Sequence, residues 1–155
     1  ITPLALQKIL YYIQGFSLAL YDREMFNDRC EAWVHGPVYR EIYDRFAYYS
    51  YNSIDSSEFD KYNNINLNEE EQKLVDEISN DFGCYSGKTL EKMTHYSLPW
   101  TNAREGIEEN EASNKEILES DMTDYFKDVI LKYNITSVED IAKYSREMFK
   151  KVSKI

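Results

Sequence analysis

Residues 2–20 read TPLALQKILYYIQGFSLAL and predict a long, largely buried helix. Thr2 is a suitable N-cap, and Pro3 stands at the first helical position, where its missing N–H costs nothing. Apolar residues then recur every three or four positions, which is the spacing of one helical face. Gly15 weakens such a helix by about 1 kcal/mol relative to Ala, which suggests close packing against a neighbour.

The next part of the chain predicts a short β-hairpin near residues 24–35. Residues alternate in type after Arg29, and Met25 and Phe26 are placed in the other strand. The Gly36-Pro37 pair is expected to end this hairpin and to begin a helix, because proline suits a first helical turn.

Three further helix starts are visible downstream. Asn68 is followed by Glu71 in the spacing of a capping box, Ser86 begins a shorter helix that Pro99 should stop, and Ser137 is expected to cap the last helix. The acidic stretch 102–116 reads as a solvated connection. The predicted fold is therefore mainly α, a compact bundle of about six helices with one small hairpin.

The length of 155 residues is that of one domain of ordinary size. We expect a single domain over 1–155, with the informative motifs in about 2–105 and an acidic connection and C-terminal helices in 106–155. Because residue 1 is Ile rather than Met, we expect the natural chain to begin further upstream.

Charge and cysteine content restrict the classes of partner. The chain has 18 Lys and Arg against 28 Asp and Glu, a net charge of −10, which argues against nonspecific nucleic-acid binding and against anionic membrane surfaces. No apolar run is long enough to span a bilayer, and two cysteines cannot build a disulfide framework. A soluble, cytoplasmic protein is expected.

The sequence predicts no metal site, no cofactor and no catalytic residue. Its two histidines and two cysteines do not have the spacing of zinc ligands, and phosphate-binding glycine motifs are lacking. An enzyme that uses His35 or His95 with a nearby Cys or carboxylate stays open as an alternative, provided that these groups share one cleft.

Tyrosine is abundant, with 14 copies, and Tyr39, Arg40 and Tyr43 fall near one predicted helix. They could form the rim of the core with their hydroxyls in water. They could equally form a protein-binding surface, where Tyr and Arg are enriched. We keep these three residues as candidate partner contacts.

Three separated motifs together resemble the Panacea domain, the family of SocA-like antitoxins and phage-associated proteins. The resemblance covers about residues 2–105. The motifs are LQKILYY at 6–12 followed by Gln14-Gly15, EAWVHGPV at 31–38 followed by Tyr43, and Thr94-His95 followed by Pro99-Trp100 and Ala103-Arg104.

The resemblance implies a helical, non-enzymatic domain that neutralises a toxin encoded beside it, usually by direct protein contact. It leaves open an adaptor that delivers the toxin to a protease, and a phage regulator that binds another host protein. It implies no cofactor, and it does not identify the toxin.

The family motif also has a structural interpretation. We expect Gln7, Lys8, Gln14, Thr94 and His95 to form an internal hydrogen-bond network between the first helix and the helix at 86–95, because buried polar groups need partners. The full set of motif residues expected to have this structural role is Gln7, Lys8, Tyr11, Gln14, Trp33, His35, Gly36, Pro37, Thr94, His95, Pro99 and Trp100.

Overall fold

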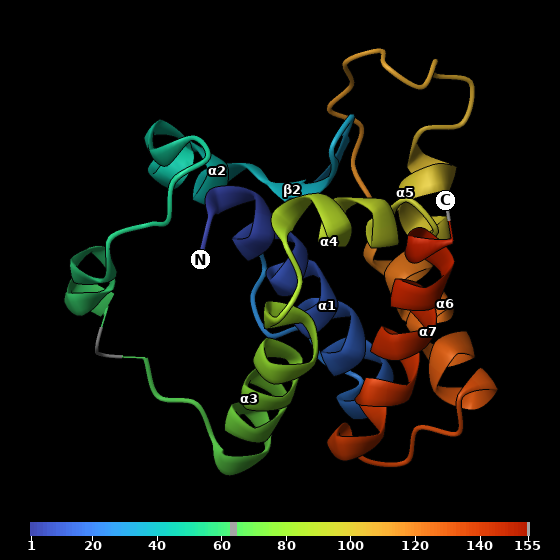
Figure 1. The fold of residues 1–155 in the computed structure, drawn as a ribbon. Helices are drawn as coiled ribbons and strands as arrows, with labels where there is room; N and C mark the ends of the chain where they lie inside the picture. Colours follow the sequence, from blue (N-terminus) through green and yellow to red (C-terminus); the bar gives the residue numbers. More distant parts are fainter. Residues whose placement is uncertain (63–64, 155) are drawn as a thin grey trace.

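The computed structural model describes residues 1–62 and 65–154 and is mainly helical, with one small antiparallel hairpin, as predicted. Its helices are arranged as a bundle around the first of them (Figure 1). The elements in chain order are α1 (Pro3–Tyr21), β1 (Cys30–Trp33), β2 (Gly36–Tyr39), α2 (Arg40–Phe46), the 3-10 helices η1 (Ala47–Tyr49) and η2 (Ser56–Tyr62), α3 (Glu69–Gly83), α4 (Gly87–Thr94), α5 (Leu98–Ala103), α6 (Glu119–Lys132), the 3-10 helix η3 (Val138–Asp140) and α7 (Ile141–Ser153).

Helix α1 lies in the middle of the bundle, between α3 and α6 in the view of Figure 1, and it also contacts α4 and β2. These neighbours on several sides explain why its buried residues are not confined to one stripe. The predicted start is confirmed, because the Thr2 hydroxyl accepts a hydrogen bond from Ala5 N at 3.3 Å and Pro3 lies in the first turn.

The core around α1 is rich in aromatic rings. Tyr12 stacks on Phe82 of α3, with 4.1 Å between ring centroids, and Phe126 of α6 meets Tyr11 and Phe16 edge to face. Helices α6 and α7 contribute to the same core as α1, α3 and α4. Many of the abundant tyrosines therefore belong to the interior and not to a contact surface.

The hairpin lies later in the chain than predicted. Strand β1 pairs with β2 so that Cys30 opposes Tyr39 and Trp33 opposes Gly36, and residues 34–35 form the turn. The assignment of Met25 and Phe26 to a strand was wrong. Pro37 lies within β2 and does not begin a helix, which is compatible with a strand because β2 is an edge strand, where proline is tolerated.

Two predicted helix boundaries also need correction. Pro99 does not stop α4, which ends at Thr94; it lies in the first turn of α5, a position that suits proline. Ser137 makes no capping hydrogen bond, and neither does Asp140, the N-cap residue of α7, whose carboxylate accepts from Thr136 N in the preceding loop at 3.0 Å. The capping box of α3 and the start of α4 after Ser86 are confirmed.

Within residues 1–62 and 65–154, no helix is both long enough and apolar enough to cross a membrane.

The contact between α1 and α6 predicts a strong effect of Gly15→Ala. A Cβ atom at this position would overlap the buried Phe126 ring, so we expect α6 to shift and the free energy of unfolding to fall by roughly 1–2 kcal/mol, despite the better helix propensity of Ala. Thermal unfolding followed by circular dichroism measures this loss.

Gly83→Ala is the matched control, since a Cβ at the last residue of α3 meets nothing within 4 Å. We expect this variant to be as stable as the wild type or slightly more stable. Equal melting temperatures for the two variants would contradict the close contact between α1 and α6.

Candidate functional site

Buried polar side chains of α1 join this helix to the hairpin. The Gln7 amide donates to Tyr39 O at 3.2 Å and accepts from Tyr39 N at 2.8 Å, so it pairs with β2 much as a neighbouring strand would. Lys8 Nζ donates to Pro37 O at 2.9 Å. The predicted hydrogen-bond network between α1 and the 86–95 helix was wrong, because the bonds of Gln7 and Lys8 run from α1 to β2.

Gln14 makes an equivalent link about two turns further along α1. Its Oε1 accepts from Met25 N at 2.8 Å, and its Nε2 donates to Phe26 O at 2.6 Å. Gln14 therefore hydrogen-bonds the backbone groups of Met25 and Phe26 that we expected to pair with a neighbouring strand. Tyr11 reaches the turn between α4 and α5, where its hydroxyl is hydrogen-bonded to Ser97.

Gly36 packs tightly against side chains of both α1 and α4. Its φ of +104° is unfavourable for other residues, and a Cβ atom would lie 2.7 Å from Thr94 Oγ1 and 2.9 Å from Lys8 Cε. The Thr94 hydroxyl donates to Glu91 O within its own helix at 2.8 Å. Thr94 therefore contributes to the hairpin through packing.

The Lys8 amine is fully buried, and burial lowers its pKa to about 7. Burial also raises the pKa of the nearby Cys30 thiol to about 12. Neither side chain lines the groove described below. Their positions identify Lys8 as an internal donor to the Pro37 carbonyl, and Cys30 as part of the core.

The remaining motif residues fix the other side of the hairpin. Trp100 Nε1 donates to Trp33 O at 2.8 Å, and the His95 ring stacks on Trp100 with 4.2 Å between centroids. Arg104 Nη1 donates to Ala32 O at 3.0 Å, while its Nη2 donates to Glu111 O at 2.6 Å. Motifs that lie far apart in the sequence thus converge on the hairpin.

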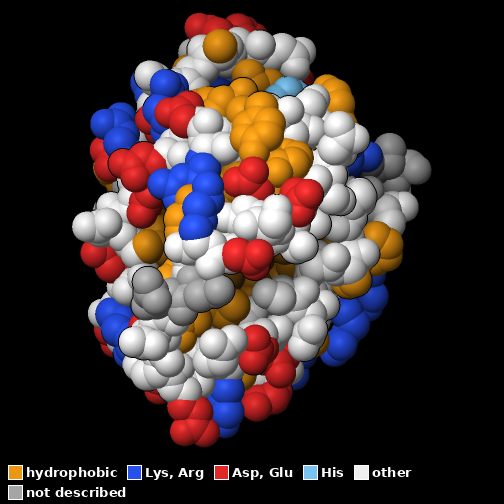
Figure 2. Space-filling view, turned by 90° about the vertical axis from the view of Figure 1, so that its left-hand side faces the viewer, with side chains coloured by type: hydrophobic (Ala, Val, Ile, Leu, Met, Phe, Trp, Pro, Cys, Tyr) orange, Lys and Arg blue, Asp and Glu red, His pale blue; other side chains and the backbone are white. Residues whose placement is uncertain are grey.

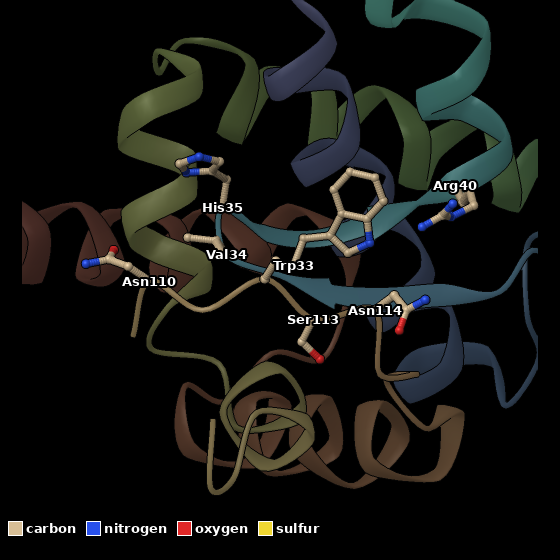
Figure 3. A pocket seen from close by; sticks show the side chains of 8 residues that line it. Trp33, Val34, His35, Arg40, Asn110, Ser113 and Asn114 are labelled. Carbon is tan, nitrogen blue, oxygen red and sulfur yellow. The ribbon is translucent and has the colours of Figure 1, made fainter. Parts of the chain in front are cut away.

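An open groove of about 710 Å³ lies between the tip of the hairpin and the loop that follows α5 (Figure 3). Figure 3 shows the Trp33 and Arg40 side chains turned toward each other, with Ser113 and Asn114 on the loop that runs past the hairpin. The residues that line the groove are Trp33, Val34, His35, Arg40, Asn110, Ala112, Ser113 and Asn114.

The aromatic and arginine side chains at this groove hold one another in place. The Arg40 guanidinium lies 5.2 Å from the centre of the Trp33 ring, and Tyr43 meets that ring edge to face at 4.7 Å. The buried Glu31 carboxylate accepts from Trp33 Nε1 at 2.8 Å and from Arg40 Nε at 3.3 Å. We call the residues Trp33, His35, Arg40 and Tyr43 the hairpin-tip surface.

The three candidate partner contacts do not lie together on the surface. Tyr39 is only 1% exposed, because it lies in β2 facing the core, where its ring meets Phe26 edge to face. It cannot touch a partner. Arg40 and Tyr43 are exposed, with half of the Arg40 side chain and 40% of Tyr43 accessible.

The two histidines have different surroundings. His35 is exposed in the hairpin turn, with Nδ1 3.1 Å from Glu91 Oε1, whereas His95 is half-buried against Trp100. Only His35 lines the groove, and no cysteine, aspartate or glutamate lines it. No cluster of three or more potential metal ligands occurs in the part of the chain that the structure describes.

Sequence reasoning missed the contribution of the loop after α5, which was interpreted as a solvated connection. Asn110, Ser113 and Asn114 line the groove, and Arg104 fixes the loop to the hairpin. Arg104 belongs to the third family motif, and this was the one feature of the sequence that could have indicated a role for the loop. Aromatic and arginine side chains that gather in this way, with Trp33 at the hairpin tip and Arg40 and Tyr43 on α2, are typical of a protein-binding surface.

The comparison with known families agrees with this class. The model of the family "Antitoxin SocA-like, Panacea domain" matches residues 6–101, and the chain belongs to that family. The matched range contains most of α1, the whole hairpin and most of α5, and so includes the residues that join these elements. No curated protein and no solved structure matches the chain.

The buried Lys8 amine predicts a distinctive pH dependence of stability. Its pKa falls from the ordinary 10.5 to about 7 in the fold, so between these values the unfolded chain binds more protons and the free energy of unfolding rises with pH. We expect a rise of about 1–2 kcal/mol between pH 7 and 8.5 in the wild type, and a nearly flat profile for Lys8→Met. Chemical denaturation at several pH values measures both profiles.

This pH window limits the contribution of other buried groups. Burial lowers the pKa of His95 below 6.5, and burial raises the pKa of the Cys30 thiol from 9.0 to about 12, so this thiol lowers the free energy of unfolding mainly above pH 9, where only the unfolded thiol ionises. A Lys8→Met variant with the same slope as the wild type would show that Lys8 is protonated throughout the window.

Proposed function

We propose that this protein is a non-enzymatic antitoxin that neutralises a toxin, encoded beside it, by direct contact through the hairpin-tip surface. The observation that carries the proposal is the grouping of the half-buried Trp33 ring with the exposed side chains of Arg40 and Tyr43, in which buried Glu31 binds Trp33 and Arg40 from inside. We expect the protein to act in the cytoplasm, with the toxin as its partner and without a cofactor.

The chemistry of these side chains supports a role as binding anchors. Trp, Tyr and Arg dominate the energetics of protein interfaces, and a few such residues carry most of the affinity. The Arg40 guanidinium over the Trp33 ring and its hydrogen bond to Glu31 hold both side chains in place before binding. Ordering them therefore adds little to the entropic cost of association.

The pattern of side chains on one face of the molecule favours a protein partner. On the face seen in Figure 2, hydrophobic side chains gather beside a histidine and charged side chains of both signs border them, an arrangement common to protein interfaces. The net charge of −10 would speed the approach of a basic partner.

Substitution of the anchors provides the test. We expect Trp33→Ala and Arg40→Ala each to weaken the complex with the product of the adjacent gene by about 30-fold or more, as measured by isothermal titration calorimetry. In cells that express both genes, the same variants should fail to restore growth.

Tyr51→Ala is the matched control, because this tyrosine is 90% exposed and outside the hairpin-tip surface. It should bind the partner as the wild type does. Unchanged affinity of the Trp33 and Arg40 variants would contradict the proposed surface. If the wild-type protein restores growth only while a host protease removes the toxin, delivery of the toxin to that protease, and not direct neutralisation, is the mechanism.

A further inference from the structure

The loop that follows α5 adds a third extended segment to the hairpin. Ala32 N donates to Lys115 O, and Ile117 N donates to Cys30 O, both at 2.8 Å, so that Glu116 lies opposite Glu31 in an antiparallel bridge. The order across this small sheet is therefore segment 115–117, then β1, then β2.

The two outer edges of this sheet differ. Along β2, the α1 side chains Gln7 and Lys8 bind the backbone groups of Tyr39 and Pro37. Along segment 115–117, the two backbone hydrogen bonds to β1 are made by Lys115 O and Ile117 N. The N–H and C=O of Glu116 therefore point to the opposite side, away from β1.

On that outer side the Glu116 backbone is open. Neither its N–H nor its C=O has a hydrogen-bond partner among residues 1–62 and 65–154. An unpaired strand edge of this kind is a template for a further strand, and extended peptides bind many domains by adding to such an edge.

A second groove, of about 350 Å³, lies against this open edge, between the end of α5 and the start of α6. Three acidic residues, Glu105, Glu116 and Asp121, and one basic residue, Lys115, line it, so its net charge is negative. None of the three acidic side chains forms a salt bridge within the described chain. Leu118, which also lines the groove, is 53% exposed. The unpaired backbone groups of Glu116, three acidic side chains and the exposed Leu118 side chain thus lie at one place.

We propose that segment 115–117 accepts an extended, basic segment of the partner protein as an added strand. The backbone of that segment would pair with Glu116, its Lys or Arg side chains would face Glu105, Glu116 and Asp121, and an apolar side chain would cover Leu118. This inference rests on the proposed function, in that the partner is the toxin, and it adds a contact outside the hairpin-tip surface.

Titration of the full ¹⁵N-labelled chain with a defined peptide tests the proposal. The probe is the acetylated peptide Lys-Val-Lys-Thr-Lys-Val-Lys-Thr, and the matched control carries N-methyl groups on its backbone amides at the same charge. We expect saturable NMR shifts of the Glu116 and Leu118 amides with the probe and at least tenfold weaker binding of the methylated peptide. Equal binding of both peptides, or shifts spread over other acidic surfaces, would overturn the proposal.

Two substitutions at one position separate backbone pairing from charge. Glu116→Pro removes the outward N–H but leaves the ladder bonds of Lys115 and Ile117, whereas Glu116→Thr removes the charge and keeps the N–H. We expect the proline variant to bind the probe at least tenfold more weakly, and the threonine variant only a few-fold more weakly. The comparison of the two peptides on the wild-type chain decides the question if the proline variant does not fold.

The hairpin-tip variants distinguish this proposal from the proposed function. Trp33→Ala and Arg40→Ala should leave binding of the probe unchanged while they weaken association with the adjacent gene product. If Glu116→Pro binds that product as the wild type does, the added strand is wrong and the proposed function stands. If the chain binds the probe at Glu116 and not the adjacent gene product, the proposed function fails.

Discussion

The pairing of α1 side chains with the outer edge of β2 is the constraint on which the hairpin depends. The backbone of Tyr39 and the carbonyl of Pro37 are buried, and a buried backbone group without a partner is costly. Gln7 supplies both a donor and an acceptor to Tyr39, and Lys8 supplies a donor to Pro37. Because α3, α4 and α6 surround α1, the hairpin is fixed relative to the whole bundle.

This constraint explains which aromatic residues are available to a partner. Tyr39 and Trp33 lie at opposite ends of the hairpin strands, but Tyr39 is held against the core by Gln7, whereas Trp33 lies beside the turn that emerges from it. The buried Glu31 then orients Trp33 and Arg40 from below. The buried Glu31 carboxylate needs donors to compensate for its lost hydration. Arg29, Arg40 and Trp33 surround it and supply them.

The sequence allowed most helices to be predicted, because their signals are local: caps at Thr2 and Asn68, and apolar residues at helical spacing. It did not allow the hairpin register to be predicted, since Gly36-Pro37 resembles a helix start and the carbonyl that Pro37 presents is matched by Lys8, 29 residues away. The groove was missed for the same reason. Its loop residues acquire a role only through the contacts of Arg104 with Ala32 and Glu111.

The same loop borders both proposed contact regions, and its attachment bears on affinity. A flexible loop must be ordered when a partner binds, which costs free energy for each immobilised residue. Here Arg104 binds the carbonyls of Ala32 and Glu111, and Ile117 N binds Cys30 O, so the loop is fixed at both ends before any partner arrives. The hairpin-tip surface and the open edge at Glu116 therefore keep a fixed distance from each other before a toxin that contacts both of them binds. Binding at either surface then raises the effective concentration of the toxin at the other, which adds affinity without further contacts.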